Sequence, residues 1–596
     1  MKRSSLLISS VVLALIIVFF YQRNNKPTAV VGEKVLAMAN ESVIKGMDPV
    51  RAEDAYMARE VSKVYEGLME FHYLKRPFEL SPNLAAEMPT VSEDQLVYTF
   101  KIREGVVFQD DACFKDKKGR ELTAADFVYA LKRIADPKIQ SSGFWLVDGR
   151  IKGLNEWREH NETTDTVYYD QEIEGLKALD KYTLQITLTA PYPQILYALT
   201  MPQSFVVAHE AVSYYGADFM NHPVGTGPYV LKNFSMQDST LVYHKNPTFR
   251  DKFFPTEASD EYQYMLDEYA GKKLPFVDKI VVSILPEVHP RWLQFQGGQI
   301  DTIEVSKTKL ATEVFVEGGL PAELQKQEVQ LFASPSVETS YIVFNVEHPV
   351  FKDNLKLRQA ISLAFDAVGY NELFFNSKAI AAQSTIPPGL AGYKADYKNP
   401  YLTYNLPKAK QYLAEAGYPE GKGLPIITMD IASTTDHKQK GEFFQRCMAQ
   451  IGIRVQLVEN LFPVLLNKRL QKSTMLHTLT WSGDYPDAEN FLQLFYGPIQ
   501  PSGLGSNIHH NVFDALYKKA SILQDSSVRT ELYEQMNQIV AEYVPAIYTT
   551  HPLHVSLQHS WLKNYCWSSF HYGTELYWDI DVDKKQDMIT SFNSTK

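Results

Sequence analysis

Short hydrophobic runs alternate with polar, turn-forming stretches along the chain from residue 33 onward. Residues 34–39 are mostly apolar, and residues 97–102 alternate between apolar and polar side chains, so both are predicted to be β-strands. Residues 229–232 follow a turn with two glycines and predict a third strand. No run recurs at a fixed period and no low-complexity tract appears, which predicts a globular body of short strands and amphipathic helices.

Two helix predictions rest on local signals. Residues 52–65 have helical spacing, and Gly67 is placed where a glycine commonly ends a helix. Thr123 followed by Asp126 is typical of the capping box at a helix start, which predicts a helix over residues 127–134.

The first 32 residues differ from the rest and are predicted to be an export signal or membrane anchor with its linker. Met1–Arg3 is basic, and Ser4–Tyr21 has no charge and a dense apolar run. Bulky side chains at Phe19–Tyr21 stand where a signal peptidase prefers small ones, which favours an uncleaved anchor. The first cysteine is Cys113, which excludes a lipoprotein signal. The remainder is expected outside the cytoplasmic membrane, either tethered by Ser4–Tyr21 or released.

Composition narrows the classes of function further. With 596 residues, the chain is long enough for several domains, and 45% hydrophobic, 22% charged and 12% aromatic residues exclude global disorder. The net charge is −11 and no long basic run occurs, so nucleic acid is not expected as a partner.

The sequence contains no recognisable catalytic or metal-binding motif. Cys113, Cys447 and Cys566 lie too far apart for a disulfide framework or a cysteine-rich metal site. His551 and His554 lack a cysteine or acid at ligand spacing and are expected to be core or solvated residues. Hydrolase and metalloprotease motifs are missing as well. We therefore expect no enzyme, no catalytic residue, no metal and no cofactor.

A series of motifs, in a fixed order, carries a family resemblance. The motifs are Val64–Leu68, Leu84–Ala85, Tyr98–Phe108, Leu122–Val128, Pro223–Tyr229, Asn246–Pro247, Gly298–Asp301, Phe344–Asn345, Leu357–Ile361, Ile386–Gly389 and Ala414–Tyr418. In this order the chain resembles the peptide-type extracytoplasmic solute-binding proteins of ABC importers, also called solute-binding protein family 5. The resemblance extends over about residues 34–577.

The resemblance implies an α/β, periplasmic-binding-protein-like fold with two lobes. Lobe one would be discontinuous and consist of residues 33–56, 205–340 and 544–596. An extra domain of the peptide-binding class would occupy residues 57–204, and lobe two residues 341–543. Ligand would bind in the cleft between the lobes and close it.

The acidic stretch Asp251–Leu274 is long for the family and looks like an insertion. It either covers the mouth of the cleft or is a passive surface loop, and the passive interpretation is favoured.

The most informative local segment for ligand binding is Thr480–Leu492, which is both aromatic and acidic. Trp481 and Tyr485 offer flat apolar surface beside the carboxylates of Asp484 and Asp487, a combination suited to holding a solute. In the family that the chain resembles, the acid three positions after this tryptophan pairs with the α-ammonium of a peptide, which implies that role for Asp484. The competing interpretation is that both acids only cap the following helix, and this role is preferred for Asp487.

No comparable signal identifies a group for the peptide carboxylate. In the dipeptide-binding branch an arginine about 50 residues before the acid has this role, but residues 429–445 offer only His437, Lys438 and Lys440. Oligopeptides held mainly through their backbone would need no such cation and are therefore favoured. Nickel, oligosaccharides and opines remain alternative ligands, because the same scaffold carries them.

The resemblance implies a monomeric receptor that captures a peptide in the periplasm and delivers it to an ABC permease in the cytoplasmic membrane. A binding or sensor scaffold uncoupled from transport is the alternative, and an uncleaved anchor at residues 4–21 would suit it.

Overall fold

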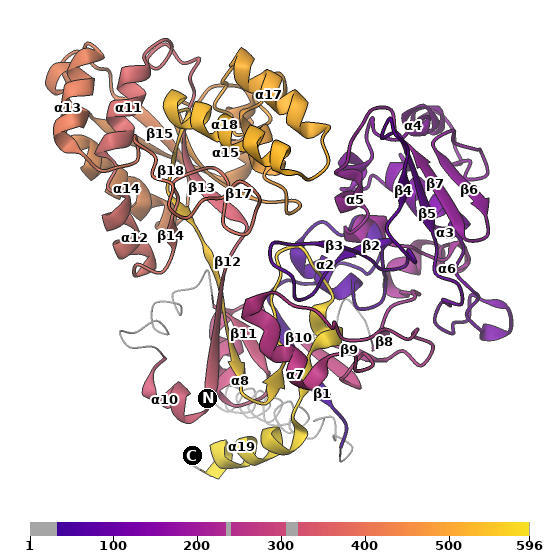
Figure 1. Cartoon of the computed structure of the whole chain (residues 1–596). Coiled ribbons are helices and arrows are strands. Elements are labelled where there is room, and N and C mark those ends of the chain that lie inside the picture. Colours follow the sequence, from indigo (N-terminus) through magenta and orange to yellow (C-terminus); the bar gives the residue numbers. More distant parts are fainter. Residues whose placement is uncertain (1–31, 234–239, 306–319, 595–596) are drawn as a thin grey trace, which may run out of the picture.

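The computed structural model describes residues 32–233, 240–305 and 320–594. Sheets flanked by helices form two lobes and a further domain, which confirms the predicted α/β architecture (Figure 1). The predicted anchor Ser4–Tyr21 lies outside the described residues. Within those residues, no helix has the length and apolar character needed to span a bilayer.

Lobe two, drawn in orange in Figure 1, is built on a five-stranded sheet in the order β16, β15, β17, β13, β18. The strands are β13 (Glu338–Phe344), β15 (Ile427–Ala432), β16 (Val455–Asn460), β17 (Leu476–Ser482) and β18 (Ala546–Tyr548). The helices are α11 (Leu355–Ala364), α12 (Ala367–Phe375), α13 (Leu406–Glu415), α14 (Thr435–Ala449), α15 (Phe462–Leu470), α16 (Glu489–Leu492), α17 (Asn511–Ser521) and α18 (Ser527–Tyr543). The range 544–596, expected in lobe one, includes β18, yet β18 pairs with β13 in this sheet.

Lobe one contains two sheets made from distant parts of the chain. One has the order β1, β10, β9, β8 with β1 parallel to β10, and the other is antiparallel in the order β11, β20, β12. The strands are β1 (Val35–Asn40), β8 (Tyr229–Asn233), β9 (Thr240–Lys245), β10 (Lys279–Ile284), β11 (Thr302–Glu304), β12 (Val329–Pro335) and β20 (Leu553–His559). The helices are α2 (Ala55–Val61), α7 (Leu266–Tyr269), α8 (Val288–Gln296), α10 (Ala322–Lys326) and α19 (Val582–Ser594). Lobe one is therefore discontinuous, as expected.

The extra domain has an antiparallel sheet in the order β4, β5, β7, β6. Its strands are β4 (Thr90–Val91), β5 (Val97–Lys101), β6 (Leu176–Asp180) and β7 (Thr183–Thr187), with a hairpin of β2 (Met69–Phe71) and β3 (Leu80–Pro82). Its helices are α3 (Ala124–Ala135), α4 (Leu154–Glu162) and α5 (Ile195–Ala198), and α6 (His209–Tyr215) follows it. Two small ladders pair β14 (Ile380–Ala381) with β19 (Thr550–His551) and β21 (Leu562–Lys563) with β22 (Asp579–Ile580).

The two helix predictions had different outcomes. The capping box is present, because the Thr123 backbone amide donates to Asp126 Oδ2 at 2.8 Å, and α3 begins directly after Thr123. The other helix, α2, is shorter than predicted and ends at Val61. Gly67 does not cap it. A Cβ at Gly67 would stand 2.8 Å from the carbonyl oxygen of Leu199, so this glycine allows two backbone segments to approach closely.

Lobe two is joined to lobe one by two neighbouring crossings. One leads from β12 into β13, and the other returns from β18 through β19 into β20. The crossings contact each other where the Ser336 amide donates to the Pro552 carbonyl at 2.9 Å. Figure 1 shows this narrow connection between the upper and lower parts of the molecule. We expect a change in the angle between the lobes to occur here.

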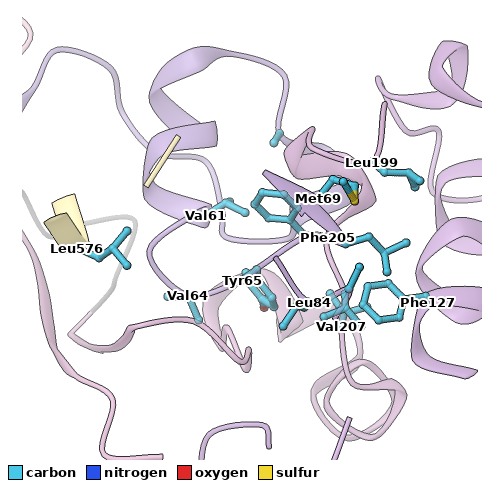
Figure 2. Packing of buried hydrophobic residues seen from close by; sticks show 14 of the residues in the cluster. Val61, Val64, Tyr65, Met69, Leu84, Phe127, Leu199, Phe205, Val207 and Leu576 are labelled. Atoms are coloured by element: carbon cyan, nitrogen blue, oxygen red, sulfur yellow. The ribbon is translucent and has the colours of Figure 1, made fainter. Parts of the chain in front are cut away.

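The buried hydrophobic residues form two large cores and a small third one, which lies in lobe one among α8, β11, β12 and β20. One of the large cores joins lobe one to the extra domain, and Figure 2 shows part of it, which extends from Leu576 and Val61 of α2 on one side to Leu199 and Phe127 of the extra domain on the other. The other fills lobe two. Since a shared apolar core resists relative motion, lobe one and the extra domain should move as one body against lobe two.

The carboxylate of Asp301 joins three remote parts of lobe one. It is fully buried and accepts hydrogen bonds from the Ala37 amide and from Trp561 Nε1, both at 2.7 Å. Lys585 Nζ of α19 lies 2.7 Å from the same carboxylate. Asp301 is the last residue of one of the family motifs, and its role here is structural.

The insertion Asp251–Leu274 is folded against the body of the protein. Phe254 and Tyr269 are buried in the core that lobe one shares with the extra domain. The Ser259 amide donates to the Leu74 carbonyl at 2.8 Å. The expectation of a passive surface loop is therefore wrong, because its aromatic residues complete a hydrophobic core.

Candidate ligand-binding site

The loop between β17 and α16 is organised by one buried side chain, Asn490. Its Oδ1 accepts from Trp481 Nε1 at 2.9 Å and from the Asp484 amide at 3.0 Å. Its Nδ2 donates to Asp484 Oδ2 at 2.9 Å. The structure thus brings Trp481 and Asp484 together through a residue that the sequence did not single out. An asparagine can both accept and donate, which is what this loop requires of the side chain.

Asp484 is a half-buried carboxylate without a cation. Burial raises its pKa, and the hydrogen bond from Asn490 only partly opposes this. In the part of the chain that the structure describes, no lysine, arginine or histidine nitrogen lies within 4 Å of it. Among the described residues, Asn490 alone donates a hydrogen bond to its side chain. A carboxylate in this state gains from a cationic ligand.

Tyr485 lies in a cluster of tyrosine side chains that includes Tyr197. Its hydroxyl donates to Glu489 Oε2 at 2.7 Å, and its ring stacks on Tyr197 of the extra domain with centroids 5.4 Å apart and planes 7° apart. Only 5% of Tyr485 is exposed. In this structure it joins lobe two to the extra domain, and its predicted contact with ligand, like that of the partly exposed Trp481, stays a prediction.

Asp487 has a larger role than the predicted helix cap. The Glu489 amide donates to its Oδ1 at 2.9 Å, as a cap near the start of α16 would require. Its Oδ2 also lies 2.7 Å from Arg529 Nη2 of α18, with both side chains 3% exposed. Tyr533 donates a further hydrogen bond to it at 2.7 Å. Asp487 therefore attaches the loop to α18.

Glu489 is a second buried carboxylate behind the loop. Burial raises its pKa, the neighbouring charge of Asp487 adds to this, and the hydroxyl groups of Tyr485 and Tyr517 oppose it by donating to the carboxylate. Glu489 thus links Tyr485 of the loop to Tyr517 of α17 and supports the loop from behind.

Lobe one contributes the opposite wall, which encloses a hollow of about 100 Å³. The wall is formed by the end of β1, by α2, by β11 and by the segment 565–578. It is rich in aromatic residues, which are Tyr56, Tyr565, Trp567, Tyr572 and Trp578. Arg59 of α2 is among its charged groups.

Tyr572 connects the two walls electrostatically. Burial raises the pKa of its phenol, Arg59 lowers it, and Asp484 raises it. Both charged groups are therefore close enough to act on one side chain, although Arg59 belongs to lobe one and Asp484 to lobe two. Gly483 packs nearby, since a Cβ there would lie 3.3 Å from Phe570 of the lobe-one segment. The loop of Asp484 thus faces the cleft between the lobes.

The cations considered for the peptide carboxylate are engaged elsewhere. Lys438 lies 3.1 Å from Glu459 and Lys440 lies 2.8 Å from Asp436, so neither is free in this structure. His437 is close to the start of α14, where its amide is bound by the Thr434 side chain.

The histidines fit the interpretation as core residues. His551 is 1% exposed, and burial lowers its pKa to about 4. His554 stacks on Trp567 with centroids 3.9 Å apart. Among the residues that the structure describes, no group of three or more histidine, cysteine, aspartate or glutamate side chains is placed to hold a metal ion.

Comparison with known proteins identifies relatives over most of the chain. The profile of "Bacterial extracellular solute-binding proteins, family 5 Middle" matches residues 79–502. The heme-binding protein A of Haemophilus influenzae is 26% identical over 552 residues, covering 88% of this chain and 87% of that protein. The dipeptide-binding protein of Escherichia coli is 26% identical over 543 residues, covering 88% and 90%.

Solved structures share the fold. The periplasmic murein tripeptide-binding protein MppA in its unliganded open form superposes with a TM-score of 0.72 at 20% identity, covering 92% of this chain and 98% of that one. HbpA2 from Haemophilus parasuis gives 0.73 at 22% identity, covering 92% and 100%. The expected periplasmic-binding-protein-like fold is confirmed.

Proposed function

Because this chain belongs to the bacterial extracellular solute-binding proteins of family 5, we propose that it captures a peptide between its lobes and delivers it to an ABC permease. The relatives include a dipeptide-binding protein and a di/tripeptide-binding protein, and both match almost their full length. The chain therefore covers 90% and 92% of the lengths of these two relatives. Nothing in its chemistry requires catalysis.

The observation that carries the peptide assignment is the state of Asp484. Its carboxylate is half-buried and lacks a cation in the described part of the chain. It belongs to a loop that Asn490 organises and that packs, through Gly483, beside Phe570 of lobe one. The α-ammonium group of a peptide would supply the missing positive charge. A charge-assisted hydrogen bond would then offset the cost of burying the carboxylate.

The proposal is tested by isothermal titration calorimetry with alanine peptides of two to five residues, each with a free or an acetylated N-terminus. Acetylation removes the ammonium group, and Asp484→Asn removes the carboxylate charge. Each change alone should weaken binding about 30-fold or more. The two losses should not add, because both remove the same interaction. Asp396→Asn, at an exposed carboxylate in a loop of lobe two, is the control and should bind like wild type.

If no alanine peptide binds, the peptide assignment fails. If free and acetylated peptides bind wild type equally, Asp484 does not recognise an ammonium group.

A second candidate ligand is heme, because one relative at 26% identity is a heme-binding protein. The aromatic wall of the hollow offers flat apolar surface that suits a planar ligand. Titration with hemin distinguishes heme from peptide as the ligand, because binding would change the absorption spectrum of hemin. Heme binding should also respond to Asp484→Asn differently from peptide binding.

The remaining parts of the proposal concern location and partners. The family is extracytoplasmic. The uncharged stretch Ser4–Tyr21 would tether the receptor beside its permease, and we expect a monomer to be sufficient for delivery. Carbonate extraction of membranes tests the tether, because an anchored protein stays in the membrane pellet whereas a released one does not.

A further inference from the structure

The cleft presents charges of opposite sign on its two walls. Arg59 lies on lobe one, where it lines the same hollow as Tyr572. Asp484 lies on lobe two next to Gly483, where an added Cβ would stand 3.3 Å from Phe570 of the lobe-one segment that carries Tyr572. A ligand that binds between the lobes therefore meets an anion on one side and a cation on the other.

Arg59 has free hydrogen-bonding capacity. Its side chain is 34% exposed and lines the hollow, and its charged neighbour is Glu304, whose Oε2 lies 3.8 Å from Nη2. At this separation Arg59 and Glu304 form an ion pair, but the two atoms are too far apart for a hydrogen bond. Within the described residues, no hydrogen bond from the Arg59 side chain is found. A guanidinium group has five N–H donors, so it can bind a carboxylate through two of them.

Two other cations of lobe one, Arg291 in this wall and Lys63 behind it, already have partners. Arg291 Nη2 lies 2.7 Å from Glu41, and Nη1 donates to the carbonyl groups of Leu285 and Pro286. Lys63 is buried between Glu60 and Glu575, at 3.0 and 3.2 Å. These lysine contacts also neutralise two acids that would otherwise repel an anionic ligand.

We propose that Arg59 binds the carboxylate of the peptide whose ammonium group is held by Asp484. This assignment rests on the proposed function and supplies the group that the segment 429–445 lacks. The ligand class is then a short zwitterionic peptide with both ends free, held by the two lobes at once.

Two fixed charges on opposite walls also select peptide length. A peptide that is too short reaches only one of them, and a longer one must bend or leave its carboxylate unpaired at a cost. Affinity should therefore peak at one length within the alanine series. The peak should depend on both Arg59 and the free carboxylate.

The test compares free-acid and C-terminally amidated alanine peptides of two to five residues by calorimetry. For wild type, amidation at the preferred length should weaken binding at least tenfold. Arg59→Gln should weaken binding of the free acid by a similar factor, should leave the amide nearly unchanged, and should remove the length preference. Arg59→Lys keeps the charge but loses the paired donors, so its loss should be intermediate. Arg51→Gln, at an exposed arginine that does not line this hollow, is the matched control and should behave like wild type.

The outcomes separate this inference from the proposed function. If Asp484→Asn and N-acetylation weaken binding but Arg59→Gln still discriminates acid from amide as wild type does, Arg59 does not bind the carboxylate and the receptor function stands. If no alanine peptide binds wild type, both fail. The thermal midpoint of Arg59→Gln is the control for folding. If it equals that of wild type, a loss of affinity in this variant is not caused by unfolding.

Discussion

The two acids of the ligand loop should respond in opposite ways to the same substitution, and Asp487→Asn is the more revealing. The asparagine keeps an oxygen for the Glu489 amide and for Tyr533, so the cap near α16 survives. It removes the negative charge that lies 2.7 Å from Arg529.

The free-energy cost of this substitution depends on the charges that remain around Arg529. Leaving a buried charge without its partner costs about 3–5 kcal/mol. Asp525 stays 2.6 Å from Arg529 Nη1, but it is 76% exposed and therefore compensates weakly. We expect the free energy of opening α18 to fall by about 3 kcal/mol, the lower end of that range.

Hydrogen exchange measured by mass spectrometry reports the free energy of opening α18 itself. A local measurement is needed because a protein with several domains need not unfold in one step. Amides of α18 should exchange roughly 100-fold faster in Asp487→Asn than in wild type. Asp525→Asn removes the exposed partner of the same arginine and should change exchange by less than about fivefold. Equal rates in the two variants would refute the argument that the buried pair attaches the loop to α18.

Other perturbations test the rest of the molecule. Because burial raises the pKa of Asp484, its ionised form destabilises the folded state, so Asp484→Asn should leave the thermal midpoint unchanged or higher at pH 7. Peptide affinity should be full above that raised pKa and fall as the pH drops through it, which calorimetry from pH 7 to pH 4 measures. Tyr197→Leu removes the stack on Tyr485, worth about 1 kcal/mol, and should increase the radius of gyration of the unliganded protein in X-ray scattering. Asp301→Asn leaves Lys585 without its buried partner and should lower the thermal midpoint without changing peptide affinity at 20 °C.

The fold could be predicted largely because its signals are local. The capping box of Thr123 and Asp126 specifies its helix within four residues, and the strand at residues 97–102 is fixed by alternation. Gly67 was misjudged for a related reason. A glycine after a helical pattern suggests a cap, whereas the close approach of Leu199 that requires it depends on folding of the extra domain.

The site was predicted less completely, since its contacts join distant parts of the chain. Asn490 lies within the segment singled out, but no local signal distinguishes a buried asparagine from a surface one. Arg59 looked like an ordinary helix residue, and only the arrangement of Tyr572 beside it indicates a wall of the cleft. The stack of Tyr197 on Tyr485 likewise exists only after two domains meet.

Lobe one is built from three separate stretches of the chain, and this affects the order in which the parts of the protein can fold during synthesis. The sheet of lobe two draws its strands from residues 338–548, so it can assemble as soon as that stretch has been synthesised. One sheet of lobe one comes from residues 35–284, but the lobe is completed later, because Lys585 Nζ donates to the Val35 carbonyl at 3.1 Å and Trp561 is bound to Asp301. Contacts of such long sequence separation form late, since the chain entropy lost in closing the loop precedes any gain. The cleft is thus completed last, and a chain still being synthesised has no place to bind its ligand.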